Sequence, residues 1–293
     1  MKKIILSLFL ISLSFTLISL PFQPTVGETS QQQVESLIEQ GDNAAKKARH
    51  QNRTEEQLRK SLNIYQRVLE IDPDNLHALN RLSLGYYMLA EAYLTYSEKK
   101  EAYQKGFDYG LRSLRTNPDF RRLHDEKGFS ALKDLPQSVV NAHGLAWTAA
   151  NLGTLMEWKG VFESLDILPA LVSLNQRVIE LDKGYLGAAA HCALGCISAE
   201  VLKKTPLTFW QVHKYGFSWE GTREHFEKAI ELSPKNLANY FSYAYYYAYN
   251  KDKEDLAMRL LDKVISEPLG DNYPLMNMIA KNKAKILIGI IQT

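Results

Sequence analysis

Apolar residues recur at steps of three and four along almost the whole chain after residue 31. This spacing places them on one face of an α-helix, and the alternation typical of a half-buried strand is almost absent. Four short segments interrupt the pattern, and in each a proline or glycine stands beside Asp, Asn or Ser, which end one helix and cap the next. These segments are residues 69–75, 114–119, 181–184 and 230–236. The pattern predicts an all-α fold.

The periodic segments between these turns define the helices that we expect. Two stretches, residues 119–135 and 203–218, lack a clear period and are predicted to be insertions between helices. The last periodic segment is predicted to be a C-terminal capping helix. The expected helices are 32–50, 54–71, 75–97, 99–116, 136–160, 166–182, 185–203, 219–233, 236–250, 253–266 and 272–291.

A repeat is visible in the turns, because Pro234 and Pro268 are 34 residues apart, which is the period of the tetratricopeptide repeat. Counting from Pro73 and Pro234, the bulky, small and aromatic positions of that repeat all carry a fitting residue type. The other turns are spaced more widely, so we predict an irregular tetratricopeptide-like helix-pair superhelix. The fitting positions are Leu79, Leu82, Ser83, Tyr86, Tyr240, Tyr243, Ala244 and Tyr247 in first helices, and Ser61, Tyr65, Val68, Thr222, Phe226 and Ala229 in second helices.

Residues 1–27 have the pattern of an export signal: two lysines, an apolar run over residues 4–20 and then a proline. Small residues before Glu28 suit cleavage there, which leaves residues 28–293 as a single all-helical domain in the periplasm. The alternative is an uncleaved N-terminal anchor, since a run of this length is at the lower limit for crossing a bilayer. No cysteine precedes Cys192, so the chain is not predicted to be a lipoprotein.

The net charge of +2 comes entirely from Lys2 and Lys3, so the exported chain is close to neutral. A neutral chain has no basic field to attract nucleic acid, and membrane contact is predicted only through an uncleaved N-terminal segment. Cys192 and Cys196 lie one turn apart on a predicted helix, where Cβ atoms are about 5–6 Å apart and too distant for a disulfide. We interpret both as small core residues.

Catalytic motifs are missing from the sequence. It contains no Gly-rich phosphate loop, no His-Glu-x-x-His and no Gly-x-Ser-x-Gly, and its seven histidines have no metal-ligand spacing. His124 belongs to a charged triplet that we interpret as solvated surface. The sequence therefore predicts a binding protein without enzymatic activity, cofactor or metal.

The first helices of stacked pairs line a concave face, where a ligand or a partner can bind. After Pro234 that face should carry a stripe of Phe241, Tyr245 and Tyr249, although neighbouring helices could equally bury it. After Pro73 the same face carries Tyr87 among mixed polar and apolar residues. These aromatic residues are candidate ligand-binding residues.

Four polar or aromatic residues at core-like positions are further candidates. Trp147 and Asn151 lie one turn apart on a helix of small residues, where they could line a cavity or simply pack in the core. Asn175 stands where a second helix usually places an aromatic residue, which indicates a polar cavity or a register one residue away. His191 is on a helix of Ala, Gly and Leu, where a structural role is the alternative to ligand binding.

Five segments taken in order resemble one known family, the T-component of TRAP transporters: residues 106–111, 144–151, 168–182, 187–195 and 226–250. The resemblance covers roughly residues 60–290. It implies a periplasmic accessory subunit that docks a solute-binding protein, and it is compatible with a homotrimer and with an internal channel for a ligand. Many members of this family are lipoproteins, whereas this chain lacks the cysteine that would carry the lipid.

Together these observations predict a periplasmic accessory subunit of a TRAP-type secondary transporter. It would bind the solute-binding protein and a small organic or hydrophobic ligand. The alternative is a generic exported tetratricopeptide adaptor that gathers envelope proteins by recognising extended peptides or helices in its groove. Co-purification with a solute-binding protein favours the first function, and binding to a broad set of peptides favours the second.

Overall fold

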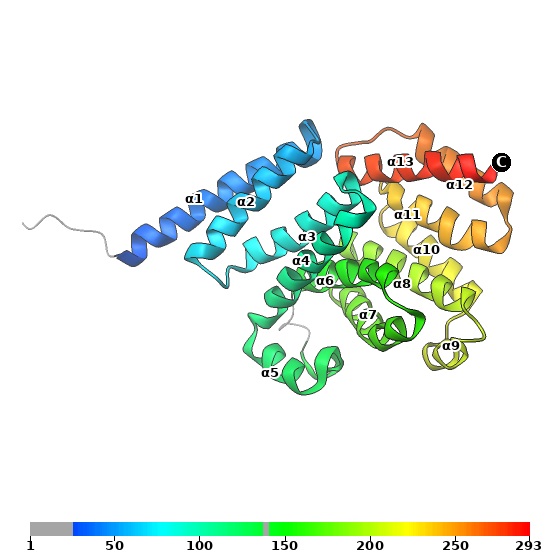
Figure 1. Cartoon of the computed structure of the whole chain (residues 1–293), viewed down its shortest axis with the longest axis horizontal. Helices are drawn as coiled ribbons and strands as arrows, with labels where there is room; N and C mark the ends of the chain where they lie inside the picture. The colour runs from blue at the N-terminus through cyan, green and yellow to red at the C-terminus, as the bar shows by residue number, and fades with distance from the viewer. Residues whose placement is uncertain (1–25, 137–140) are drawn as a thin grey trace, which may run out of the picture.

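The computed structural model describes residues 26–136 and 141–293, and the predicted all-α fold is confirmed for them. This part of the chain contains 13 α-helices and no strand (Figure 1). The helices are α1 (Val26–Lys46), α2 (Glu55–Ile71), α3 (Leu76–Tyr93), α4 (Tyr96–Arg115), α5 (Pro118–Lys127), α6 (Ala142–Leu155), α7 (Val161–Leu181), α8 (Tyr185–Lys203), α9 (Phe209–Tyr215), α10 (Trp219–Leu232), α11 (Leu237–Ser242), α12 (Glu254–Ser266) and α13 (Pro274–Ile291).

Helix starts are fixed by side chains that accept hydrogen bonds from the free N–H groups of the first turn. The capping predicted for the turns at Pro73, Pro118 and Pro234 is confirmed, because the asparagine of each turn caps the next helix. Each cap replaces a lost intrahelical bond and so sets the residue at which the helix begins. The residues that cap in this way are Thr54, Asn75, Asn117, Asn141, Ser218 and Asn236.

Both predicted insertions contain short helices. Residues 119–135 form most of α5 and the 3-10 helix η2 (Gly128–Asp134), because Asn117 caps α5, Pro118 occupies its first turn and Phe120 is fully buried. Residues 203–218 contain α9. The predicted helix 136–160 is shorter than expected, since α6 begins at Ala142 and changes to a 3-10 turn at Met156. The predicted signal segment lies outside the described residues except for Val26 and Gly27, which begin α1.

The helices stack in chain order, each on the next, from α1 to α4, then through α6, α7, α8 and α10 to α13. The helices α5 and α9 pack on the side of this stack. Figure 1 shows α1 and α2 at one end of the molecule and α12 and α13 at the other, with α6, α7 and α8 between them. The end helix α13 packs on both α11 and α12, and it also contacts α3.

Every position that the repeat pattern predicts to be in the core is buried, although the tetratricopeptide repeat itself stays a prediction. Two helix pairs share one contact, in which a glycine of the first helix packs against an aromatic ring of the second. A Cβ at Gly41 would lie 2.7 Å from the Tyr65 ring, and a Cβ at Gly195 would lie 2.9 Å from the Phe226 ring. The small positions therefore let the helices approach closely.

The C-terminal helix α13 joins the two ends of the stack. Its first turns place Leu275 and Ile279 in the core cluster of α2 and α3, and its last turns pack Ala284 and Leu287 against α11 and α12. This helix therefore closes the superhelix as well as capping it.

Among the described residues, one helix has the length and composition to cross a membrane. It is α8, with a mean hydropathy of 1.4 over the most apolar window. Half of that window is buried, because α8 packs between α7 and α10 in the middle of the stack. Its apolar character is accounted for by this central position.

Candidate functional site

Three aromatic rings meet where α3, α4 and α6 cross. The ring of Tyr87 on α3 lies 5.8 Å from the indole of Trp147 and 6.0 Å from the ring of Tyr103, centroid to centroid. Tilted ring pairs at this distance stabilise one another through their quadrupoles. Of the residues singled out in the sequence, Tyr87 and Trp147 are therefore brought into contact.

Trp147 has an unusual polar environment. Its side chain is 6% exposed, and its indole Nε1 is buried without a hydrogen-bond partner among the described residues. Leaving a buried donor unpaired costs about 1–3 kcal/mol, and most buried tryptophans find a partner for this N–H. The indole N–H is therefore free to donate to a bound acceptor.

Two thiols and a hydroxyl lie on the α8 and α11 side of Tyr87. The thiol of Cys196 donates a hydrogen bond to Cys192, which lowers the pKa of Cys192 even though burial opposes this, and Ser242 of α11 contributes a second hydrogen bond. The same bond, with burial, raises the pKa of Cys196. Burial raises the pKa of Tyr87, and the charges of Glu91 and Cys192 add to the effect. These side chains therefore lie close to one another.

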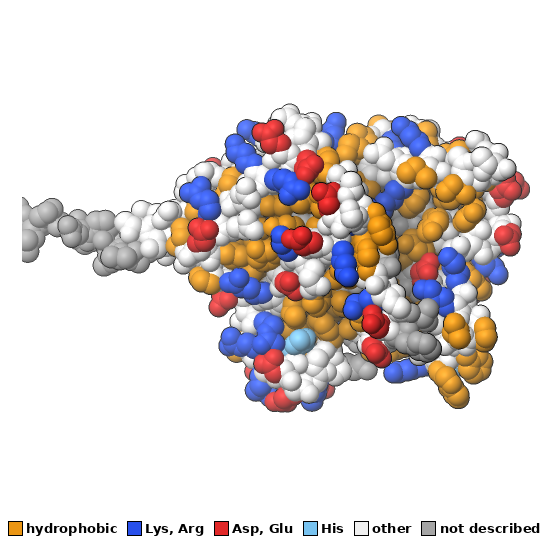
Figure 2. Space-filling view, in the orientation of Figure 1, with side chains coloured by type: hydrophobic (Ala, Val, Ile, Leu, Met, Phe, Trp, Pro, Cys, Tyr) orange, Lys and Arg blue, Asp and Glu red, His pale blue; other side chains and the backbone are white. Residues whose placement is uncertain are grey.

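We call Tyr87, Trp147, Cys192, Cys196 and Ser242 the inner cluster. It draws side chains from both halves of the stack, and all of them except Trp147 are half-buried. Figure 2 shows that the visible face is hollowed between α3 and α4 on one side and α11 and α12 on the other, with hydrophobic side chains along the hollow. The inner cluster is the best candidate for a ligand site in the described part of the chain.

Asn151 lies one turn beyond Trp147, but its side chain is buried between neighbouring helices. Its side-chain amide donates to the backbone oxygens of Trp147 at 2.8 Å and Ser83 at 3.2 Å, and it is completely buried. The Ser83 hydroxyl in turn donates to the backbone oxygen of Gly106 at 2.7 Å. These bonds tie α3, α4 and α6 together, so Asn151 holds the helices that position Trp147 and Tyr87.

Asn175 and His191 form their hydrogen bonds with residues outside the inner cluster. The buried amide of Asn175 donates to the backbone oxygen of Leu171 on its own helix, at 2.8 Å. The ring of His191 faces His225 of α10, with the two Nδ1 atoms 2.9 Å apart, so one ring donates and the other accepts. Burial, with repulsion from His225, lowers the pKa of His191 to about 4, and burial lowers the pKa of His225. Both rings are therefore neutral near neutral pH.

The predicted stripe of Phe241, Tyr245 and Tyr249 is present on one helical face. Phe241 and Tyr245 stack with centroids 6.1 Å apart, and Tyr245 and Tyr249 stack at 6.3 Å. Phe241 and Tyr245 are half-buried against the core cluster of α11 to α13, whereas Tyr249 is 39% exposed. The backbone here is a π-helix, η5 (Tyr243–Ala248), a form that occurs mostly as short segments and often at functional sites.

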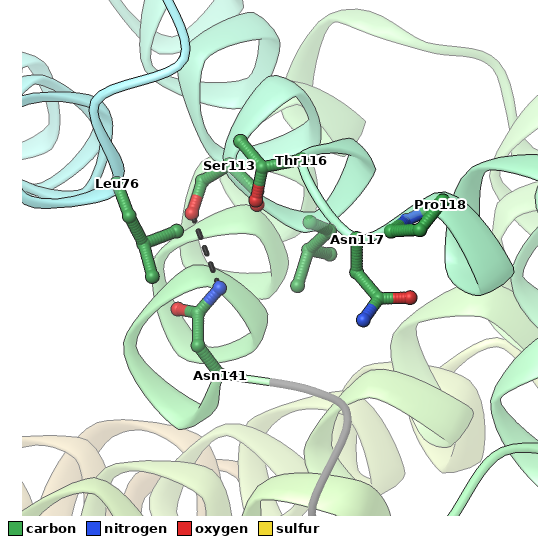
Figure 3. A pocket seen from close by; sticks show the side chains of 7 residues that line it. Leu76, Ser113, Thr116, Asn117, Pro118 and Asn141 are labelled. Carbon is green, nitrogen blue, oxygen red and sulfur yellow. Dashed lines mark hydrogen bonds between the residues drawn. The ribbon is translucent and has the colours of Figure 1, made fainter.

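A separate hollow of about 270 Å³, lined by both polar and apolar side chains, lies where α3, α5 and α6 begin (Figure 3). The amide of Asn141 donates to the Ser113 hydroxyl across it, at 3.3 Å, and that hydroxyl donates to Asn80 at 2.6 Å. Asn141 and Asn117 already cap their own helices, so their acceptor oxygens are in use. The polar groups around the hollow therefore have a structural role, because they cap the helices that meet there.

The sequence already placed Cys192 and Cys196 one turn apart on a helix, whereas the contact between His191 and His225 was missed. The two histidines are 34 residues apart, which is the repeat interval and a signal that could have indicated the contact. No local pattern indicates that Ser242 reaches the thiols. In the described ranges, no group of three or more His, Cys, Asp or Glu side chains could hold a metal ion.

Comparison with known proteins identifies the family of the chain. No curated protein matches the sequence. The model of one family, the TRAP transporter T-component, matches residues 54–291, which is most of the chain and includes every residue of the inner cluster. The chain belongs to the TRAP transporter T-component family.

Proposed function

We propose that this accessory subunit of a TRAP transporter works in the periplasm, binds the transporter's solute-binding protein and holds a small organic ligand at the inner cluster. Family membership gives the association with a TRAP transport system. A role in binding is supported by the composition of the site, which offers aromatic rings, thiols and single hydrogen-bonding groups. Assembly as a homotrimer, which the family resemblance suggests, would leave this site in each protomer.

The observation that carries the ligand proposal is the unpaired indole N–H of Trp147 beside Tyr87. Aromatic rings with one free donor beside them suit a molecule with an apolar body and a hydrogen-bond acceptor. A buried carboxylate on the ligand would need a positive partner, but the ammonium group of Lys283 is already paired with Glu91. The indole N–H of Trp147 therefore suits a carbonyl or hydroxyl acceptor better than an isolated carboxylate. The ligand class is therefore a small, largely apolar organic molecule.

Native mass spectrometry of the protein purified from the periplasm tests the ligand site. We expect a bound organic mass, and Trp147→Phe should weaken its retention about fivefold, the value of one hydrogen bond. Trp219→Phe is the matched control, because this half-buried indole lies on α10 against Tyr247. An equal loss in both variants, or no bound mass in the unmodified protein, would show that the inner cluster is not a ligand site.

Affinity capture from the native periplasm tests the partner. The proposed function requires that the solute-binding protein of the same transporter is retained, and that its binding is saturable in a purified mixture. A peptide array distinguishes the alternative adaptor, since binding to many extended peptides that disappears with Phe241→Ala and Tyr245→Ala would indicate a general groove. Capture of many envelope proteins without the solute-binding protein would refute the proposal.

A further inference from the structure

The insertion around α9 has one face that is firmly attached to the stack. The Thr208 side chain is 1% exposed, and its hydroxyl donates to the backbone oxygen of Val201 on α8 at 2.6 Å. Farther along, apolar side chains of the insertion pack against a core cluster formed by α7 and α8. These are Val212, Tyr215 and Phe217. The insertion is therefore packed on the stack in a defined orientation.

Its other face is apolar and has no partner in the described structure. Leu207, Phe209 and Trp210 are 65%, 47% and 78% exposed, and we call these three side chains the α9 tip. The ring of Phe209 lies 5.7 Å from Trp210 and 4.3 Å from His213, which holds the tip in one arrangement. Figure 1 places α9 at the edge of the molecule, and Figure 2 shows hydrophobic side chains gathered at that corner.

The segment that carries the α9 tip has an excess of positive charge. Residues 201–218 contain three lysines and no acidic residue. Lys203 and Lys204 share the single carboxylate of Glu200, at 3.4 and 3.6 Å, and Lys214 lies over the ring of Tyr215. One acidic group for three ammonium groups leaves a local excess of positive charge in a chain that is nearly neutral overall.

We propose that the α9 tip docks on the surface of a bilayer that contains anionic phospholipid. Trp, Phe and Leu are the side chains that enter the boundary between headgroups and acyl chains, and lysines next to them pair with headgroup phosphates. Protein interfaces also contain exposed aromatic residues, but their lysines are depleted. A projecting apolar tip with three lysines and a single acidic group beside it therefore fits a lipid surface better than a protein partner. The proposal is independent of the ligand site.

Fluorescence quenching by lipids brominated in the acyl chain tests the proposal on the protein purified from the periplasm. Vesicles of phosphatidylethanolamine and phosphatidylglycerol should quench Trp210, which is far more exposed than the buried Trp147. Trp210→Phe should remove the quenchable fraction. The chain has four tryptophans. The difference in quenching between the two proteins reports on Trp210 alone, so it distinguishes insertion of the tip from attachment through residues 1–25.

Charge variants test the anionic requirement. Replacing Lys203, Lys204 and Lys214 by Gln should weaken binding to phosphatidylglycerol vesicles about fivefold for each lysine, and phosphatidylcholine vesicles should bind weakly throughout. Ile286→Ser is the matched control for the tip, since Ile286 on α13 is 67% exposed, and it should leave quenching unchanged.

The possible results separate the two kinds of partner. Quenching that needs both Trp210 and anionic lipid supports the proposal. Absence of quenching overturns it, as does equal quenching by phosphatidylcholine vesicles. A photo-crosslinker at position 210 that captures a protein in place of lipid also overturns it, because the tip would then be a protein interface.

Discussion

The ion pair between Glu91 and Lys283 joins two residues that are 192 positions apart in the sequence and gives a sharp test of how α13 closes the stack. The carboxylate of Glu91 on α3 is 7% exposed and lies 2.5 Å from the Lys283 ammonium on α13, and it also accepts a hydrogen bond from the Tyr103 hydroxyl. Burial alone would raise the pKa of Glu91, but Lys283 and Tyr103 together lower it. The substitution Lys283→Met leaves this buried carboxylate with Tyr103 as its partner.

The size of the effect follows from the exposure of the two groups. Removing one member of a fully buried pair costs about 3–5 kcal/mol, because an unpaired charge remains in the interior. Lys283 is 41% exposed, so water already screens part of its interaction with Glu91. We therefore expect Lys283→Met to lower the free energy of unfolding by about 2 kcal/mol. The double variant with Glu91→Met should cost less than Lys283→Met alone, since no buried charge is left.

Urea unfolding at neutral pH measures the stability of the unmodified protein, the single variants and the double variant. Lys285→Met on the same helix is an exposed control, and its free energy of unfolding should stay within about 0.5 kcal/mol of the unmodified protein. Because the folded pKa of Glu91 is lowered, its contribution is complete above the unfolded pKa of about 4.3 and disappears as the pH falls through the folded value. A loss below about 0.5 kcal/mol in Lys283→Met would refute the reasoning. A double variant as unstable as the sum of the single variants would also refute it.

Three further predictions concern packing, pH and backbone hydrogen bonds. Gly106→Ala should cost about 2–3 kcal/mol in thermal unfolding, because its Cβ would lie 2.2 Å from Asn151 Oδ1, whereas Gly289→Ala has free space and should be neutral or slightly stabilising. Lowering the pH from 6.5 towards 4 should reduce the free energy of unfolding by about 1–2 kcal/mol, because unfolded His191 gains a proton that the folded ring excludes. This figure allows for solvent around the half-buried ring. If the free energy of unfolding has the same pH dependence in a variant with His191 and His225 both replaced by Gln, the prediction is contradicted. Asn277→Ala should cost about 3 kcal/mol in urea unfolding, because its buried amide makes three hydrogen bonds to backbone groups, and a loss under about 1 kcal/mol would contradict the role.

Much of the fold was predictable because it depends on neighbours in the sequence. The caps at Asn75, Asn117 and Asn236 act within three residues, and the periodicity of apolar positions needs only one or two turns of helix. The missed helix α5 shows the limit of this reasoning. Its exposed face is highly charged, and it is held by the burial of a single aromatic ring, Phe120, which no period reveals.

The candidate site was only partly predictable. The sequence pointed to Tyr87 and Trp147 as binding residues, and the structure brings their rings into contact. It could not show that the Asn151 amide would bond to backbone groups of neighbouring helices, because that depends on how closely α4 crosses α6. The partnership of Ser242 with the two thiols likewise depends on the placement of α11 over α8.

The sequence by itself determined most of the helices, their order and many of the residues that they bury, since these follow from capping and from the 3.6-residue period. Only the tertiary structure decided that α13 returns to α3, that Lys283 meets Glu91 and that the inner cluster forms between the two halves. Each of these contacts depends on crossing angles added over many successive helices. A small change at every crossing would carry α13 away from α3 without altering any local pattern, so no stretch of sequence encodes the closure alone.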